Sequence, residues 1–143
     1  MLLFLGLFLF SLVMSYDPTF SKHCTELAQS TYCVSSPEQW NCITCDSTIK
    51  LDYVVEENGV RALQGYDSTT QSLFVAFRGS ASIQNWIDNI KVSQITPYED
   101  ESIGVEKGFY KSYNYLKVDL FDNLSILSKK YGTRNILITG HSL

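Results

Sequence analysis

A glycine–histidine–serine triplet, Gly140, His141 and Ser142, lies near the carboxyl end of the sequence. It matches the first part of the G-x-S-x-G pattern, in which the serine stands on a sharp, strained turn between a strand and a helix. The turn exposes the hydroxyl for nucleophilic attack, and the flanking residues are small because backbone passes close by. Here the triplet follows an apolar run at 135–139. The pattern predicts that Ser142 is a nucleophile, although a glycine-rich turn that merely ends a strand has the same three letters.

A serine nucleophile also needs hydrogen-bond donors for the oxyanion, each worth about 3 kcal/mol. In folds built on this turn, one donor is the backbone N–H of the residue after the serine, here Leu143. The other comes from a loop that follows an earlier strand. The apolar run 73–77 is followed by Arg78, Gly79 and Ser80 in the required order. Gly79 would permit a close approach of the backbone there.

The elements that must position these residues can be predicted from the hydrophobic pattern. Segments 49–55 and 60–66 flank a turn signal and predict a hairpin-like pair, and the continuous apolar runs 73–77 and 135–139 predict two buried strands. Segment 94–105 resembles a loop. The spacing over 109–131 predicts a helix with Gly132 as its C-cap. Its apolar stripe consists of Tyr113, Leu116, Leu120, Leu124 and Leu127.

A shorter amphipathic helix is predicted over residues 82–91. Its apolar residues follow the spacing i, i+3, i+4 and i+7, and they are Ile83, Trp86, Ile87 and Ile90. From the period alone, the simplest interpretation is a helix that packs on the sheet.

The amino-terminal segment and the cysteines both indicate export. Residues 2–14 form an apolar run of 13 without charge, which fits a signal peptide at 1–15 better than a membrane-spanning helix of about 20 residues. A short membrane anchor is the alternative. Four cysteines, Cys24, Cys33, Cys42 and Cys45, cluster in the segment 16–48, which favours disulfides over a zinc or redox site. The net charge of −4 and the absence of a basic block argue against a nucleic-acid partner.

Four segments in register resemble the class 3, or fungal-type, triacylglycerol lipases. The resemblance runs from about Tyr32 to Leu143. The segments are the cysteine segment Tyr32–Cys33 with Trp40 to Cys45, the run from Phe77 to Ile87, the motif from Lys107 to Tyr113, and the turn from Ile136 to Leu143.

This resemblance implies an α/β-hydrolase fold, of which residues 49–143 would be the N-terminal half, and a Ser-Asp-His triad with Ser142 as nucleophile. It assigns the oxyanion donors to Ser80 and Leu143. It also implies a lid at about 81–94 that turns its apolar face to a lipid–water interface, with Ser82, Ile83, Trp86, Ile87 and Ile90 as lid residues. It further implies a short-loop disulfide between Cys42 and Cys45 and a distant partner for Cys33. A bond between Cys24 and Cys33 is a weaker expectation.

The sequence departs from the family pattern at three places. Glu106 stands where the family has a histidine before its Gly-Phe motif, and Asn89 stands where it has an aspartate, so a lid latch between Arg78 and that aspartate is in doubt. The triad aspartate and histidine have no counterpart among the 143 residues. Of the two histidines present, His141 is the x residue of the turn, and His23 is expected on the surface.

We therefore expect a secreted serine esterase of the lipase type that acts on carboxylic esters of lipids and uses no metal or organic cofactor. These 143 residues alone are expected to be inactive. The alternatives are a non-catalytic protein that binds lipid surfaces and a small cysteine-rich binding module. The sequence does not distinguish triacylglycerol, phospholipid and feruloyl-type esters. Asn123, in Asn123–Leu124–Ser125, is a candidate N-glycosylation site, although a helix is a poorer acceptor than a loop.

Overall fold

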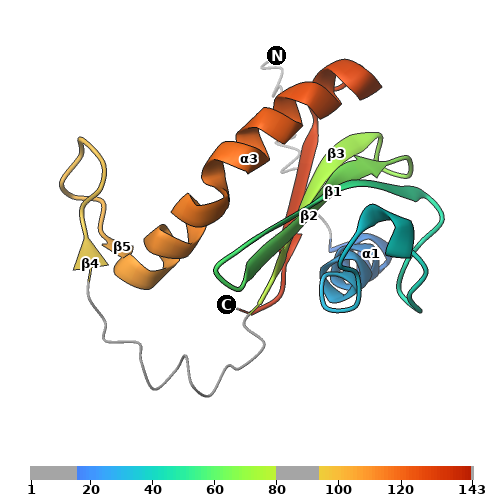
Figure 1. Ribbon diagram of the computed structural model, residues 1–143, viewed down its shortest axis with the longest axis horizontal. Helices are drawn as coiled ribbons and strands as arrows, with labels where there is room; N and C mark the ends of the chain where they lie inside the picture. The colour runs from blue at the N-terminus through green and yellow to red at the C-terminus, as the bar shows by residue number, and fades with distance from the viewer. Residues whose placement is uncertain (1–15, 80–93, 143) are drawn as a thin grey trace, which may run out of the picture.

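The computed structural model describes residues 16–79 and 94–142 of the 143-residue chain. Two α-helices, a short 3₁₀ helix and six strands are assigned in these ranges (Figure 1). In chain order they are α1 (Pro18–Ser30), η1 (Pro37–Gln39), β1 (Ile49–Glu57), β2 (Val60–Asp67), β3 (Ser72–Arg78), β4 (Gln94–Ile95), β5 (Val105–Glu106), α3 (Lys107–Tyr131) and β6 (Ile136–Gly140). The expected signal peptide at 1–15 lies outside the described residues.

The main sheet has four strands in the order β1-β2-β3-β6. The first three form an antiparallel meander, and the tight turn between β1 and β2 places Asn58 and Gly59 at positive φ, 52° and 81°. Strand β6 runs parallel to β3, with Leu73 opposite Ile136 and Phe77 opposite Gly140. The parallel register brings the carboxyl ends of β3 and β6 to the same edge of the sheet. Short strands β4 and β5 pair within the segment that was expected to be a loop.

The two helices cover opposite faces of this sheet (Figure 1). Under α1, the buried cluster consists of Leu27, Val34, Ile49, Leu51, Leu63, Phe74 and Ala76. Under α3, it consists of Val55, Ala62, Val75, Leu116 and Leu120. Strand β3 contributes to both clusters, so the prediction that it is buried on both faces is confirmed. None of the helices in the described ranges is long and apolar enough to cross a bilayer.

Helix α1 was not predicted from the sequence, although its start is marked by Asp17 and Pro18. The Asp17 carboxylate accepts hydrogen bonds from the backbone of Thr19 and Phe20, and Pro18 occupies the first turn. His23 lies on this helix, and its Nε2 atom is 2.8 Å from Oδ2 of the buried Asp67. The expectation that His23 is a surface residue is therefore wrong, because its side chain anchors α1 to the end of β2.

Helix α3 is confirmed, two residues longer at its start than predicted. Gly132 is its C-cap at a φ of 66°, and Leu116, Leu120 and Leu127 of the predicted stripe are buried. The first residue of that stripe, Tyr113, is exposed. Gln64, fully buried in β2, donates to the carbonyl of Leu120 at 3.0 Å and so fixes the helix on the sheet.

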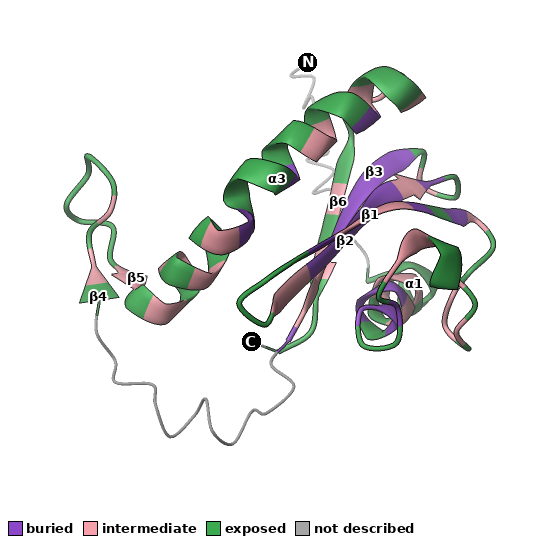
Figure 2. Cartoon of the chain, viewed as in Figure 1, coloured by how far each residue is buried: buried purple, intermediate pink, exposed green. Residues whose placement is uncertain are grey.

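Strand β6 is not buried on both faces as predicted. Its residues alternate between exposed and intermediate, and Ile136 and Ile138 are 47% and 67% exposed (Figure 2). On the α1 side Leu137 packs against the core and Thr139 donates to the carbonyl of Cys24 at 3.1 Å. On the other side α3 contacts β1, β2 and β3. The described elements thus leave the opposite face of β6 uncovered.

The cysteine segment contains one disulfide among the described residues, between Cys42 and Cys45, as predicted. Both cysteines pack against the core under α1 together with Trp40. Cys24 and Cys33 are free. The expected bond between these two is therefore absent, and Cys33 is exposed.

Candidate active site

Ser142 stands directly after β6 in a strained backbone conformation. Its φ is 59°, in the left-handed region that side chains other than glycine seldom adopt. The strand ends at Gly140, two residues before Ser142. A serine held at positive φ at the end of a parallel strand is the geometry expected of a nucleophile whose hydroxyl must stand clear of the sheet.

The backbone of Gly79 lies directly against this turn. A Cβ atom added to Gly79 would lie 2.3 Å from the carbonyl oxygen of His141 and 2.8 Å from Cβ of Ser142. Gly140 is also close to its neighbour, since a Cβ there would lie 3.3 Å from the backbone oxygen of Phe77. Gly79 precedes the predicted oxyanion residue Ser80, and its backbone is therefore in van der Waals contact with residues 141–142. Residues 140–142 are called the serine turn below.

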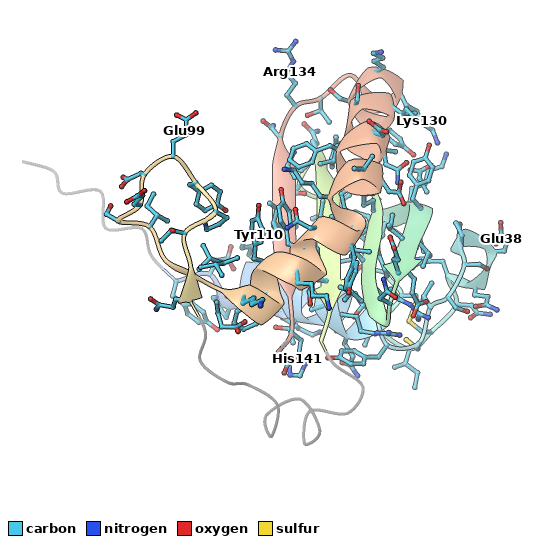
Figure 3. All side chains as sticks on the ribbon, turned by 60° about the vertical axis from the view of Figure 1, so that its left-hand side comes forward. Glu38, Glu99, Tyr110, Lys130, Arg134 and His141 are labelled. Carbon is cyan, nitrogen blue, oxygen red and sulfur yellow. A yellow bond between two sulfur atoms is a disulfide. The ribbon has the colours of Figure 1, made fainter. Side chains whose placement is uncertain are left out.

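Tyr32, just after α1, reaches both sides of this junction. Its hydroxyl oxygen accepts a hydrogen bond from the N–H of Gly79 at 3.1 Å and lies 2.9 Å from Nδ1 of His141. The Tyr32 and His141 rings meet edge to face at 5.8 Å between centroids. Figure 3 shows His141 at one end of the sheet, opposite to Lys130.

Arg78, the last residue of β3, anchors the strand beside the site. Its guanidinium donates to Oε1 of Glu56 at 3.1 Å and to the carbonyl of Gly59 at 3.0 Å. Arg61 donates to the same carboxylate through Nε at 2.8 Å. The hydrogen bond from Arg61 and the two positive charges hold the pKa of Glu56 below its usual range, against the opposing effect of partial burial. A latch from Arg78 to residues 88 or 89 would lie outside the described residues.

Glu106 stands where the family pattern that the sequence resembles has a histidine, and it serves as a helix cap. Its carboxylate accepts a hydrogen bond from the N–H of Phe109 at 2.9 Å. Hydrogen bonds from the backbone of Gly108 and Phe109 lower its pKa. This side chain is thus committed to the start of α3, where a carboxylate also complements the helix dipole.

The structure brings together only some of the predicted site residues. Ser142 and Gly79 lie close together as expected, with His141 beside them. Ser80, Leu143 and the lid residues Ser82, Ile83, Trp86, Ile87 and Ile90 lie outside the described residues. Neither of the two histidines presents a carboxylate-bound imidazole to Ser142. His141 contacts Tyr32, and His23 is bound to Asp67.

The His23–Asp67 pair lies at the far end of β3 from Ser142. Asp67 pairs with Ser72 at the start of β3, whereas Gly79 and Ser142 follow the ends of β3 and β6. A seven-residue strand separates the two places by roughly 20 Å. The pair therefore cannot act on the Ser142 hydroxyl.

Two residues near the site or the helix anchor were not found from the sequence. Tyr32 was predicted only as part of the cysteine segment, and His23 was predicted to be a surface residue without a role. The signal for both was the unrecognised helix start at Asp17–Pro18, because a helix over 18–30 places His23 on α1 and Tyr32 at its end.

A parallel strand pair, a crossover helix and a serine turn at the carboxyl ends of the strands define the N-terminal part of an α/β-hydrolase fold. Within that class, residues 74–143 match the model of the family described as "Lipase (class 3)". The lipase of Rhizomucor miehei is 29% identical to this chain over 125 residues, and the secreted mono- and diacylglycerol lipase A of Penicillium cyclopium is 25% identical over 107. A solved triacylglycerol lipase, whose catalytic centre is a serine protease triad, matches with a TM-score of 0.76 at 26% identity.

These matches cover most of this chain but a smaller part of each relative. The two lipases align with 83% and 72% of the chain, and the solved structure with 87%. The chain spans only 34% and 35% of the two lipases and 49% of the solved structure. The similarity to class 3 lipases and the α/β-hydrolase fold, both predicted from the motifs, are thereby confirmed.

Proposed function

We propose that this chain carries the nucleophile half of a lipase that hydrolyses carboxylic esters of lipids, with Ser142 as the attacking residue. The observation that carries the proposal is the φ of 59° at Ser142, directly after a strand that runs parallel to β3. A non-glycine residue held in this region costs on the order of 1–3 kcal/mol, and such strain clusters at functional sites. The matches to lipases support the substrate class.

In the proposed reaction, the Ser142 oxygen attacks the ester carbonyl to form a tetrahedral intermediate. The C–O bond to the alcohol then breaks, the alcohol leaves with the proton taken from Ser142, and water hydrolyses the remaining acyl-enzyme to the acid and free serine. The N–H groups of Ser80 and Leu143 stabilise the oxyanion. A serine hydroxyl needs an adjacent base to accept its proton. Because His23 and His141 do not supply one, we propose that a histidine and an aspartate outside these 143 residues complete the triad. The chain by itself is then expected to be inactive.

We also propose that the protein is secreted, with cleavage near Ser15, and that it works at a lipid–water interface. A lid at 81–94 would turn Trp86 and Ile87 to the lipid. The exported relative from Penicillium cyclopium supports the first proposal. Mass spectrometry of the secreted protein should find an N-terminus within a few residues of Tyr16, and retention of residues 1–14 would contradict it.

The test of the catalytic proposal compares the full-length gene product with residues 16–143, both assayed on a short-chain p-nitrophenyl ester and on emulsified triacylglycerol. Full-length protein should turn over esters, and Ser142→Ala should lower kcat by at least about 10⁴-fold. Ser125→Ala, at an exposed position of α3, should leave turnover unchanged. Turnover by residues 16–143 that Ser142→Ala abolishes would show that a base lies within them.

The second candidate is a non-catalytic protein that binds lipid surfaces. The observation in its favour is that neither histidine of the chain is presented to Ser142. It would become the better interpretation if full-length protein binds triacylglycerol emulsions but shows no Ser142-dependent turnover on either ester.

A further inference from the structure

The hydroxyl of Tyr32 joins three parts of the fold at one point. Tyr32 follows the buried C-terminal turn of α1, where its backbone N–H donates to Gln29 at 3.1 Å. Its hydroxyl meets the N–H of Gly79 after β3, and Nδ1 and the carbonyl oxygen of His141 after β6, the last at 3.4 Å. One side chain therefore links α1 to the residues that follow β3 and β6.

The hydrogen bond to Gly79 satisfies a buried donor. Gly79 is buried, and its N–H donates to the Tyr32 oxygen. That oxygen has two lone pairs and one proton, so it can accept from Gly79 and donate to Nδ1 of a neutral His141 at the same time. Without the hydroxyl the Gly79 N–H would be left unpaired in a buried position, and the backbone would move to find another acceptor.

Movement at Gly79 would be transmitted to the nucleophile. No Cβ fits at Gly79, because it would lie 2.6 Å from the Tyr32 hydroxyl and closer still to the His141 carbonyl. Gly79 also directly precedes Ser80, the proposed oxyanion donor. Oxyanion stabilisation depends on donors held at 2.7–3.1 Å from the developing charge, so a small shift of this junction weakens it.

We infer that Tyr32 is a positioning residue for the ester hydrolysis proposed above. Its hydroxyl sets the spacing between the Gly79–Ser80 junction and the serine turn, without touching the substrate. The inference rests on the proposed function, and it assigns a catalytic effect to a residue of the cysteine segment.

The test uses Tyr32→Phe in full-length protein, with Tyr131→Phe as the matched control. Both tyrosine hydroxyls bond across elements, since Tyr131 donates to Oδ2 of Asp52 at 2.8 Å. Lys130, which precedes Tyr131 in the chain, lies at the end of the sheet opposite to His141 (Figure 3). Each change removes one oxygen and keeps the ring, so any general loss of stability should be common to both variants.

For Tyr32→Phe we expect kcat on a p-nitrophenyl ester to fall about 10-fold, with KM changed less than about twofold. Tyr131→Phe should leave both constants unchanged even where its melting temperature falls as much. A merely structural role for Tyr32 would give equal kcat values in the two variants after correction for folded fraction. That result would overturn the inference.

A second measurement does not depend on activity. In protein labelled with ¹⁵N-glycine, the Gly79 amide should exchange with solvent at least about 10-fold faster in Tyr32→Phe than in wild type, and Tyr131→Phe should not change it. Unchanged exchange would overturn the anchoring of Gly79. If the three proteins show these exchange rates but the wild type hydrolyses no ester, the proposed function fails, and the catalytic effect assigned to Tyr32 fails with it.

Discussion

At the scale of single residues, Gly79 has no room for a side chain. An alanine Cβ would lie 2.3 Å from the His141 carbonyl oxygen, which is backbone and cannot rotate away. Gly79→Ala should therefore displace the serine turn, and we expect kcat/KM on esters to fall at least about 100-fold. Gly104→Ala is the control, because the atoms nearest to its Cβ would belong to the side chain of Gln94, whose amide end at 2.9 Å can rotate away. Equal activity in the two variants would contradict the close contact.

Asn123 illustrates how a sequence motif can conflict with packing. Its Nδ2 donates to Oε1 of the buried Gln64 at 3.0 Å, so the atom that would carry a glycan points to the sheet. We expect Asn123 to be unmodified in the secreted protein, with no mass change on glycosidase treatment. Val60→Thr creates a sequon at the exposed Asn58 and tests whether the host can glycosylate this chain. A glycan mapped to Asn123 would show that this hydrogen bond does not form.

At the scale of elements, the attachment of α1 depends on Asp67. Burial alone would raise the pKa of this carboxyl, but hydrogen bonds from Thr70, His23 and the backbone of Thr69 outweigh it and hold the pKa below 3.8. A depressed folded-state pKa stabilises the fold above the unfolded value and loses that contribution as the pH falls through the folded value.

We therefore expect Asp67→Asn to lower the free energy of unfolding by about 1–3 kcal/mol at pH 6. The difference from wild type should shrink as the pH falls below about 4. Urea unfolding at several pH values measures it. Asp100→Asn, in an exposed loop where the carboxylate bonds only to Ser102, should have little effect. A pH-independent difference for Asp67→Asn would contradict the role of its charge.

The elements could be predicted from the sequence where periodicity and local contacts determine them. The hairpin of β1 and β2, strand β3 and helix α3 each carry a clear period and a turn or cap signal. Helix α1 was missed because Cys24 and the polar residues around it obscure the stripe that contains Leu27 and Ala28. The predicted burial of β6 was wrong because burial depends on which elements cover a face, and that is not encoded in the strand itself.

The candidate site could be predicted only in part, because some of its contacts depend on how distant elements pack together. The short motif identifies Ser142, and Gly79 is found because it follows an apolar strand. Tyr32 is 109 residues from His141 and bonds to it only after α1 has packed on the sheet. Contacts of this kind depend on tertiary structure, and no local pattern predicts them.

At the scale of the whole molecule, the uncovered face of β6 should affect solution behaviour. Ile136 and Ile138 form an apolar pair on a strand that, in the described part of the chain, has one neighbour. Such edges and patches favour association. Residues 16–143 should bind the dye ANS and self-associate, and Ile138→Glu should reduce both. Ile43→Glu, at an exposed apolar residue beside the disulfide, is the control. A monomer that binds no dye would contradict this prediction.

The central claim is that Ser142 is the nucleophile of an esterase, and covalent labelling tests it most directly. Full-length protein is treated with diethyl p-nitrophenyl phosphate, which phosphorylates serines activated by a base, and the adduct is located by peptide mass spectrometry. We predict one stoichiometric diethylphosphoryl group on Ser142, absent in Ser142→Ala and formed more slowly in Gly79→Ala. An unlabelled Ser142 in folded protein, or an adduct on another serine that persists in Ser142→Ala, would contradict the claim.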